Sequence, residues 1–143
     1  MKNIKETIGF IGAGNMATAL ISGLINSNQS ASKIIASSPE QEHLEKLSKD
    51  FGIKTTNNNL EVVDIADIVI LAVKPNIVQA IIDEIKDVAT DKDILIISIA
   101  AGVKINKIES QLGSPIRIIR AMPNTPASIC LLYTSPSPRD ATL

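Results

Sequence analysis

A pair of glycines near the start of the chain constrains the fold more than any other feature. Gly12 and Gly14 separate an apolar run at residues 7–11 from an amphipathic stretch at residues 15–25. With Ala17, they complete the pattern G-x-G-x-x-A directly after a predicted strand and at the start of a predicted helix. That context is typical of a turn that holds the pyrophosphate of a dinucleotide. The motif therefore predicts a nucleotide-binding α/β fold.

The remaining sequence continues the alternation of strand and helix. Further strands are predicted at residues 33–37, 53–55, 67–73, 94–99 and 116–121, and the segments at 67–73 and 94–99 are the clearest apolar runs. Helical patterns separate them at residues 39–51, 60–66, 76–88 and 105–112. Ser38 is predicted to cap the first of these helices, with Gly52 as its stop. The prediction is a Rossmann-like, doubly wound α/β fold with a mainly parallel six-strand sheet and helices on both faces.

The composition argues against several other classes of protein. Fourteen basic and fifteen acidic residues give a net charge of −1, so we expect no basic face for nucleic acid. The single cysteine, Cys130, and the single histidine, His43, cannot form an internal disulfide or a zinc set, and we expect no metal site and a cytoplasmic protein. The uncharged stretch at residues 7–32 superficially resembles a signal peptide or membrane span, but its glycines and polar end argue against both.

The end of the second strand bears on which cofactor would bind. Sites that prefer NAD place Asp or Glu there to bind the ribose hydroxyls. This chain has Ser37 and Ser38 instead, and two hydroxyls can donate to a 2′-phosphate. The interpretation is a preference for NADP (as NADPH), with Glu40 close enough to admit NAD. Helix capping is an alternative role for Ser38. The acidic residues Asp83, Glu84 and Asp87 are expected to form only a solvated helix face.

Five blocks of residues, taken in order, resemble the N-terminal domain of the pyrroline-5-carboxylate reductase family. They lie at residues 8–17, 36–39, 72–75, 98–103 and 120–126. The resemblance covers about residues 4–129, and its most specific block is Met-Pro-Asn-Thr-Pro at 122–126. It implies NAD(P)H-dependent reduction of the C=N bond of 1-pyrroline-5-carboxylate, which gives L-proline in the last step of proline synthesis. The full-length form is expected to be a homo-oligomer.

The resemblance also implies which residues form the site. The cofactor-binding residues would be Ile11, Gly12, Ala13, Gly14, Asn15, Met16, Ser38, Asn59, Ala72, Val73, Lys74, Pro75, Ala100, Ala101 and Gly102. Asn124 and Thr125 are the candidate catalytic residues, since they would line the meeting point of cofactor and substrate. As chemistry alone, the strand-ending loops among these residues could also be ordinary turns.

The resemblance stops before the end of the chain. Residues 1–129 are expected to form the dinucleotide-binding domain, and residues 130–143 an irregular tail of non-native sequence. Family members continue into a helical domain for dimerisation and substrate binding, so we expect this chain to be a truncated cofactor-binding half with little activity alone. Two alternatives stay open: a stand-alone, non-catalytic NAD(P)-binding module, and the nucleotide domain of a β-hydroxyacid-type dehydrogenase.

Overall fold

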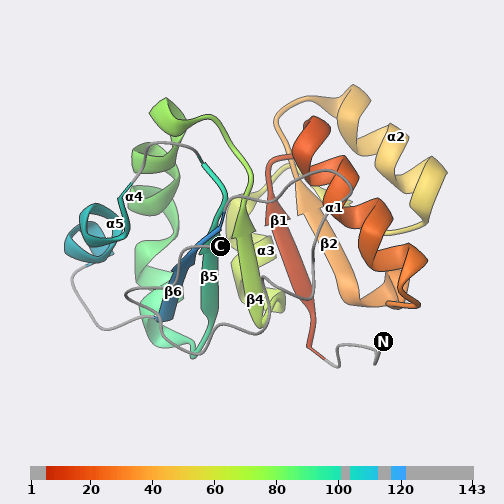
Figure 1. Cartoon of the computed structure of the whole chain (residues 1–143). Helices are drawn as coiled ribbons and strands as arrows, with labels where there is room; N and C mark the ends of the chain where they lie inside the picture. Colours follow the sequence, from red (N-terminus) through yellow and green to blue (C-terminus); the bar gives the residue numbers. More distant parts are fainter. Residues whose placement is uncertain (1–5, 101–103, 113–116, 122–143) are drawn as a thin grey trace.

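The predicted alternation folds into one sheet of six parallel strands with helices on both faces (Figure 1). This computed structural model describes residues 6–100, 104–112 and 117–121. The strands are β1 (Ile8–Ile11), β2 (Ile34–Ser37), β3 (Lys54–Thr56), β4 (Ile68–Leu71), β5 (Leu95–Ser98) and β6 (Arg117–Arg120). The helices are α1 (Asn15–Asn26), the short 3₁₀ helix η1 (Ala31–Lys33), α2 (Gln41–Phe51), α3 (Asn59–Ile65), α4 (Pro75–Asp91) and α5 (Ile105–Leu112).

The order of the strands is β3-β2-β1-β4-β5-β6, and every neighbouring pair is parallel. The chain first winds outward from β1 to β3, then returns to the middle of the sheet and winds the other way from β4 to β6. The order therefore reverses between β1 and β4. In open parallel sheets, ligands bind outside the carboxyl ends of the strands at this reversal. The fold class predicted from the sequence is confirmed, and its topology places any ligand site near the end of β1.

Alternate residues of the strands feed two aliphatic cores on opposite faces of the sheet. One core joins Phe10 and its neighbours to the buried stripes of α1 and α2. The other joins Ile11, Val69 and Ile96 to α3, α4 and α5. In Figure 1, α1 and α2 lie together beside β1 and β2, whereas α4 and α5 lie beside β5 and β6. Burial of both faces explains why the strands are continuous apolar runs rather than alternating ones.

The predicted start of α2 was wrong. Helix α2 begins at Gln41 with Glu40 in the cap position, not at Pro39 with Ser38 as the cap. The backbone N–H of Ser38 donates to the carbonyl of Thr56 at 3.3 Å, so Ser38 still belongs to the edge of the sheet. Its side chain instead accepts the N–H of Glu40 at 3.0 Å, in a turn that precedes the helix. Met16, in the first turn of α1, is 40% exposed.

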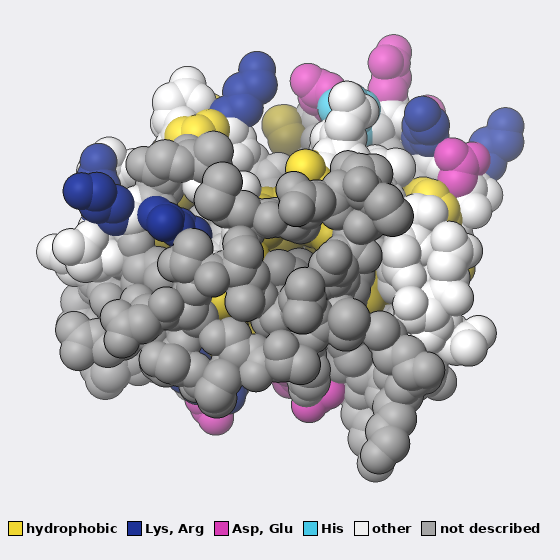
Figure 2. Space-filling model, in the orientation of Figure 1, with side chains coloured by type: hydrophobic (Ala, Val, Ile, Leu, Met, Phe, Trp, Pro, Cys, Tyr) yellow, Lys and Arg dark blue, Asp and Glu magenta, His cyan; other side chains and the backbone are white. Residues whose placement is uncertain are grey.

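Charged side chains of both signs are visible on the face drawn in Figure 2, with acidic and basic groups interspersed at its upper right. Within the described ranges, no helix combines the length and the apolar character that a membrane crossing requires.

Candidate cofactor site

Gly12 makes the tight turn at the end of β1. Its φ angle is +110°, a conformation that residues with a Cβ rarely adopt. A Cβ at this position would lie 2.3 Å from the carbonyl oxygen of Ala72, which follows β4. The N–H of Gly12 donates to the carbonyl of Ser37 at 2.9 Å, and the N–H of Ala72 donates to Ile11 at 2.9 Å. Gly12 is therefore required by the fold itself, because it joins the ends of three strands.

Gly14 has a different environment, although it belongs to the same motif. It is the cap residue of α1, with an ordinary φ of −82° and no side-chain hydrogen bond to the helix. Among the described residues, apart from its two chain neighbours, none places a heavy atom within 4 Å of a Cβ built at Gly14. The first turn of α1 carries no acidic residue, so no side chain of that turn neutralises the positive end of the helix dipole. The first backbone N–H groups of a helix have no partner within the helix, and such groups bind phosphate.

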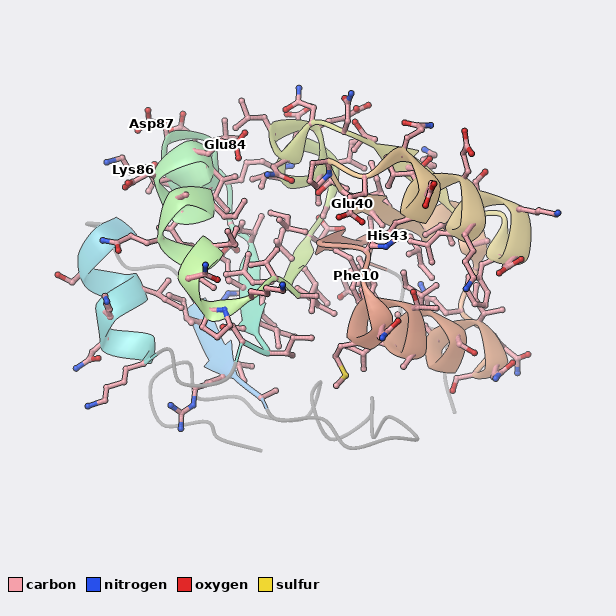
Figure 3. The ribbon with its side chains drawn as sticks, turned by 90° about the horizontal axis from the view of Figure 1, so that it is seen from above. Phe10, Glu40, His43, Glu84, Lys86 and Asp87 are labelled. Atoms are coloured by element: carbon pink, nitrogen blue, oxygen red, sulfur yellow. The ribbon has the colours of Figure 1, made fainter. Side chains whose placement is uncertain are left out.

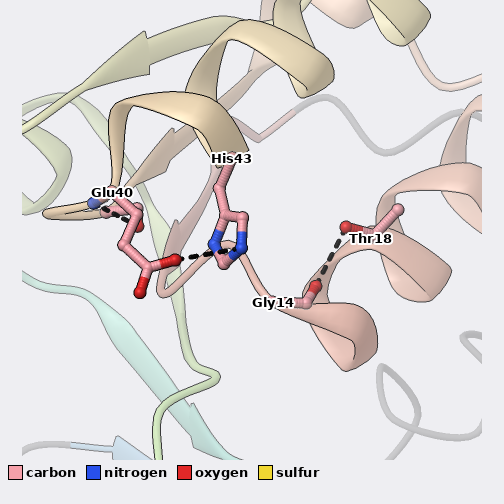
Figure 4. Close-up of polar contacts among 5 residues, drawn as sticks. Gly14, Thr18, Glu40 and His43 are labelled. Atoms are coloured by element: carbon pink, nitrogen blue, oxygen red, sulfur yellow. Dashed lines mark hydrogen bonds and ion pairs between the residues drawn. The ribbon is translucent and has the colours of Figure 1, made fainter.

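The first turn of α1 is held from within the helix. Both the backbone N–H and the hydroxyl of Thr18 donate to the carbonyl of Gly14, each at 2.9 Å (Figure 4). Ala17 is 1% exposed and packs in the first core, as the motif predicts for close contact between helix and strand. Ala13 is buried, whereas Asn15 and Met16 are exposed. The polar edge of the turn therefore consists mainly of backbone atoms.

The two serines at the end of β2, Ser37 and Ser38, differ in their hydrogen bonds. The Ser37 side chain is fully buried, and its hydroxyl donates to Oδ1 of Asn59 at 2.6 Å. Ser38 accepts the N–H of Glu40, which leaves its own hydroxyl hydrogen available to donate. Both hydroxyls were predicted to donate to a 2′-phosphate. In the structure the Ser37 hydroxyl is bonded to Asn59, whereas the Ser38 hydroxyl hydrogen is not used by the contact with Glu40.

The side chains of Glu40 and His43 meet close to Ser38. Glu40 Oε2 is 3.0 Å from Nε2 of His43, and the two side chains are 65% and 44% exposed. Figure 4 shows this pair beside the start of α1. The two residues are three positions apart, at the cap position and in the first turn of α2.

Asn59 is the first residue of α3, and its amide is bound at both ends. Its oxygen accepts the Ser37 hydroxyl, and its nitrogen donates to Oε1 of Glu84 at 2.8 Å. Glu84 belongs to α4 and was expected to be solvated only. It is exposed, but it also contacts a predicted site residue. The sequence gives only a weak indication of this contact: Glu84 precedes Ile85, which lies on the buried stripe of α4. The contact itself depends on how α3 and α4 pack.

The loops after β4 and β5 adjoin the same edge of the sheet. Ala72 and Val73 are half-buried, whereas Lys74 and Pro75 are exposed at the start of α4, where no side chain caps the helix. Ala100 is 5% exposed. Four further predicted site residues lie outside the described residues: Ala101, Gly102, Asn124 and Thr125. The same holds for Cys130 and the tail at residues 130–143. No cluster of three or more potential metal ligands occurs in the part of the chain that the structure describes.

The chain is similar to a group of reductases throughout this region. The family model described as "NADP oxidoreductase coenzyme F420-dependent" matches residues 7–102. Pyrroline-5-carboxylate reductase of Escherichia coli is 42% identical over 136 residues, which cover 94% of this chain and 50% of that protein. The chain thus spans about half the length of the curated relatives that it matches.

Two solved structures agree with this result. A pyrroline-5-carboxylate reductase from Coxiella burnetii is 39% identical, with a TM-score of 0.83 over 88% of this chain and 47% of that one. Pyrroline carboxylate reductase from Plasmodium falciparum, solved with NADP bound, is 32% identical, with a TM-score of 0.73 over 85% and 44% of the two chains. The chain therefore belongs to the family described as NADP oxidoreductase, coenzyme F420-dependent, and matches the N-terminal half of proteins named pyrroline-5-carboxylate reductase.

Proposed function

We propose that this chain binds NADP(H) at the carboxyl edge of its sheet, as the cofactor-binding part of a reductase that converts 1-pyrroline-5-carboxylate to L-proline. The observation that carries the proposal is the space beside Gly14 that the described residues leave unfilled, at an α1 N-terminus whose cap residue has no side chain. The names of the relatives supply the substrate, and the Plasmodium structure was solved with NADP bound.

The residues of this edge fit the parts of a dinucleotide. The pyrophosphate would meet the backbone of Gly12, Ala13, Gly14, Asn15 and Met16, and the adenosine ribose would meet Ser38 and Asn59. The segments 72–75 and 100–102, after β4 and β5, would line the nicotinamide side. When bound, NADPH supplies the hydride that adds to the imine carbon, while the imine nitrogen takes a proton. We propose that Asn124 and Thr125 position the imine at this point.

We propose NADPH as the preferred cofactor, with NADH also accepted. No carboxylate lies at the end of β2, where one would repel a 2′-phosphate. The hydroxyl of Ser38 can donate to that phosphate, and the start of α2 lies three residues further along the chain. Because the hydroxyl of Ser37 is already bonded to Asn59, we assign Ser37 a positioning role rather than direct contact.

The relatives are about twice as long as this chain. We therefore propose that residues 1–129 form the cofactor domain, that residues 130–143 are a tail of non-native sequence, and that turnover requires a further domain for the substrate and for assembly into a homo-oligomer. We propose a cytoplasmic location and no nucleic-acid partner, in keeping with the lone cysteine and the near-zero net charge. No contact among the described residues favours the non-catalytic module or the β-hydroxyacid-type dehydrogenase.

The proposal is tested by titrating the purified chain with NADPH and NADH, following the fluorescence of the reduced cofactor. The wild-type chain is expected to bind both saturably, NADPH more tightly. In the variant Gly14→Val, the added side chain has room in the fold but fills the space that the pyrophosphate would take. We expect this variant to melt within about 5 °C of the wild type and to bind NADPH at least about ten-fold more weakly.

Asn26→Val is the matched control, because it adds a side chain of the same kind at the other, exposed end of α1. This control should bind NADPH like the wild type. The proposal would be refuted by a folded wild-type chain that binds neither cofactor, or by a Gly14→Val variant with unchanged affinity.

A further inference from the structure

We propose that Glu84 is a specificity-determining residue of the cofactor site: its carboxylate, held against the amide of Asn59, limits the preference for NADPH over NADH. The inference rests on the proposed function and deepens it. It starts from a chain of hydrogen bonds that links the end of β2, the first residue of α3 and the middle of α4.

The orientation of the Asn59 amide follows from its two partners. The carboxylate of Glu84 can only accept hydrogen bonds when ionised, so the amide nitrogen must face it, at 2.8 Å. The amide oxygen then faces Ser37, whose fully buried hydroxyl donates to it at 2.6 Å. The second N–H of the Asn59 amide is not used by either contact. Glu84 therefore determines which end of the amide carries the donor that a ligand would meet.

The position of Glu84 replaces an acid that is missing elsewhere. In sites that prefer NAD, a carboxylate at the end of β2 accepts bonds from the ribose hydroxyls and repels a 2′-phosphate. Here β2 ends in Ser37, and a negative charge reaches the neighbouring Asn59 from α4 instead. Figure 3 shows Glu84 on the side of α4 that faces α3, whereas Lys86 lies on the opposite side.

The size of the effect follows from Coulomb's law. The two N–H bonds of the Asn59 amide diverge by about 120°, so a phosphate oxygen bound to the second would lie about 5 Å from Oε1 of Glu84, and the centres of the two charges would lie about 6 Å apart. Because Glu84 is exposed, the dielectric constant is that of water. Repulsion of a phosphate then weakens NADPH binding about ten-fold at low salt and about three-fold at physiological salt. The uncharged 2′-hydroxyl of NADH escapes this penalty.

The variant Glu84→Gln tests this inference, because glutamine has the same shape and its amide oxygen can still accept the bond from Asn59. Affinities for NADPH and NADH are measured by titration of the full chain at low salt and at about 0.5 M NaCl. We expect NADPH to bind about ten-fold more tightly than in the wild type at low salt, with NADH changed less than about two-fold. The gain should largely disappear at high salt.

Asp50→Asn is the control for net charge, since it removes one negative charge from the exposed end of α2 that lies farthest along the helix from Ser38. Its NADPH-to-NADH ratio should equal that of the wild type. An unchanged ratio in Glu84→Gln would overturn the inference, and so would an equal change in both variants. Failure of the folded wild-type chain to bind either cofactor would instead refute the proposed function, before any variant is compared.

Discussion

The replacement Gly12→Ala should destabilise the fold strongly, because the geometry of this glycine excludes a side chain on two grounds. The φ angle of +110° lies outside the regions that alanine populates. The added Cβ would also lie 2.3 Å from the oxygen and 2.8 Å from the carbon of the Ala72 carbonyl. Both are backbone atoms at the junction of β1 and β4, so no flexible side chain can move aside.

The expected loss can be estimated from these two terms. A residue held in a sparsely populated backbone region costs about 1–3 kcal/mol, and overpacking of a tight site costs about 1–3 kcal/mol. The two terms overlap, because one backbone shift relieves part of both, and we expect about 2–5 kcal/mol in total. This loss is a large part of a typical domain stability of about 5–15 kcal/mol. It should lower the melting temperature by about 8–20 °C.

The assay is thermal unfolding followed by circular dichroism, with Gly14→Ala as the matched variant of the same motif. Gly14 has a φ of −82°, and no described residue beyond its chain neighbours lies within 4 Å of its Cβ position, so the melting temperature of Gly14→Ala should stay within about 4 °C of the wild type. If Gly12→Ala melted as high as Gly14→Ala, the division of the motif into a structural and a binding glycine would be wrong.

Three further replacements probe the scaffold around the site. Gly9→Ala places a Cβ 2.5 Å from Cγ1 of Val62, so α3 must move off the sheet and urea denaturation should show a loss of about 1–3 kcal/mol; an unchanged midpoint would contradict the close packing. Asn58→Ala removes the side-chain oxygen that caps α3, and the same assay should show a loss of about 1 kcal/mol. Asp93→Asn breaks only the exposed 3.5 Å pair with Arg117, so the melting temperature should not change measurably, and a drop of several degrees would refute this assignment.

Much of the fold could be predicted from the sequence, because each buried strand is a short apolar run and each helix has one apolar stripe. The start of α2 could not. Ser38, Pro39 and Glu40 match a standard helix start, but the backbone N–H of Ser38 is bound to Thr56 of the neighbouring strand. A contact between strands that are distant in sequence thus overrides a local preference. Gly52, which has a φ of +71°, ends α2 as predicted, because only local geometry decides that position.

The candidate site divides in the same way. The glycine motif could be predicted from the sequence because Gly12 and Gly14 act through their own backbone. The contact between Asn59 and Glu84 joins residues 25 positions apart on two helices, and no local pattern encodes it. It depends on α3 and α4 packing side by side over the second core, which follows only from the assembled sheet. The role of Glu84, which lies on an exposed helix face, could therefore be inferred only after the fold was known.

The most direct test of the central claim is to map NADPH binding by amide chemical shifts in a ¹⁵N-labelled sample of the chain. Binding at the carboxyl edge predicts the largest shifts at residues 12–16, at Ser38 and at Asn59, with smaller shifts at Ala72 and Val73. The far ends of the strands, such as Ile8 and Ile34, should stay unchanged. Shifts confined to other surfaces of a folded chain, or no shifts at saturating NADPH, would contradict the account.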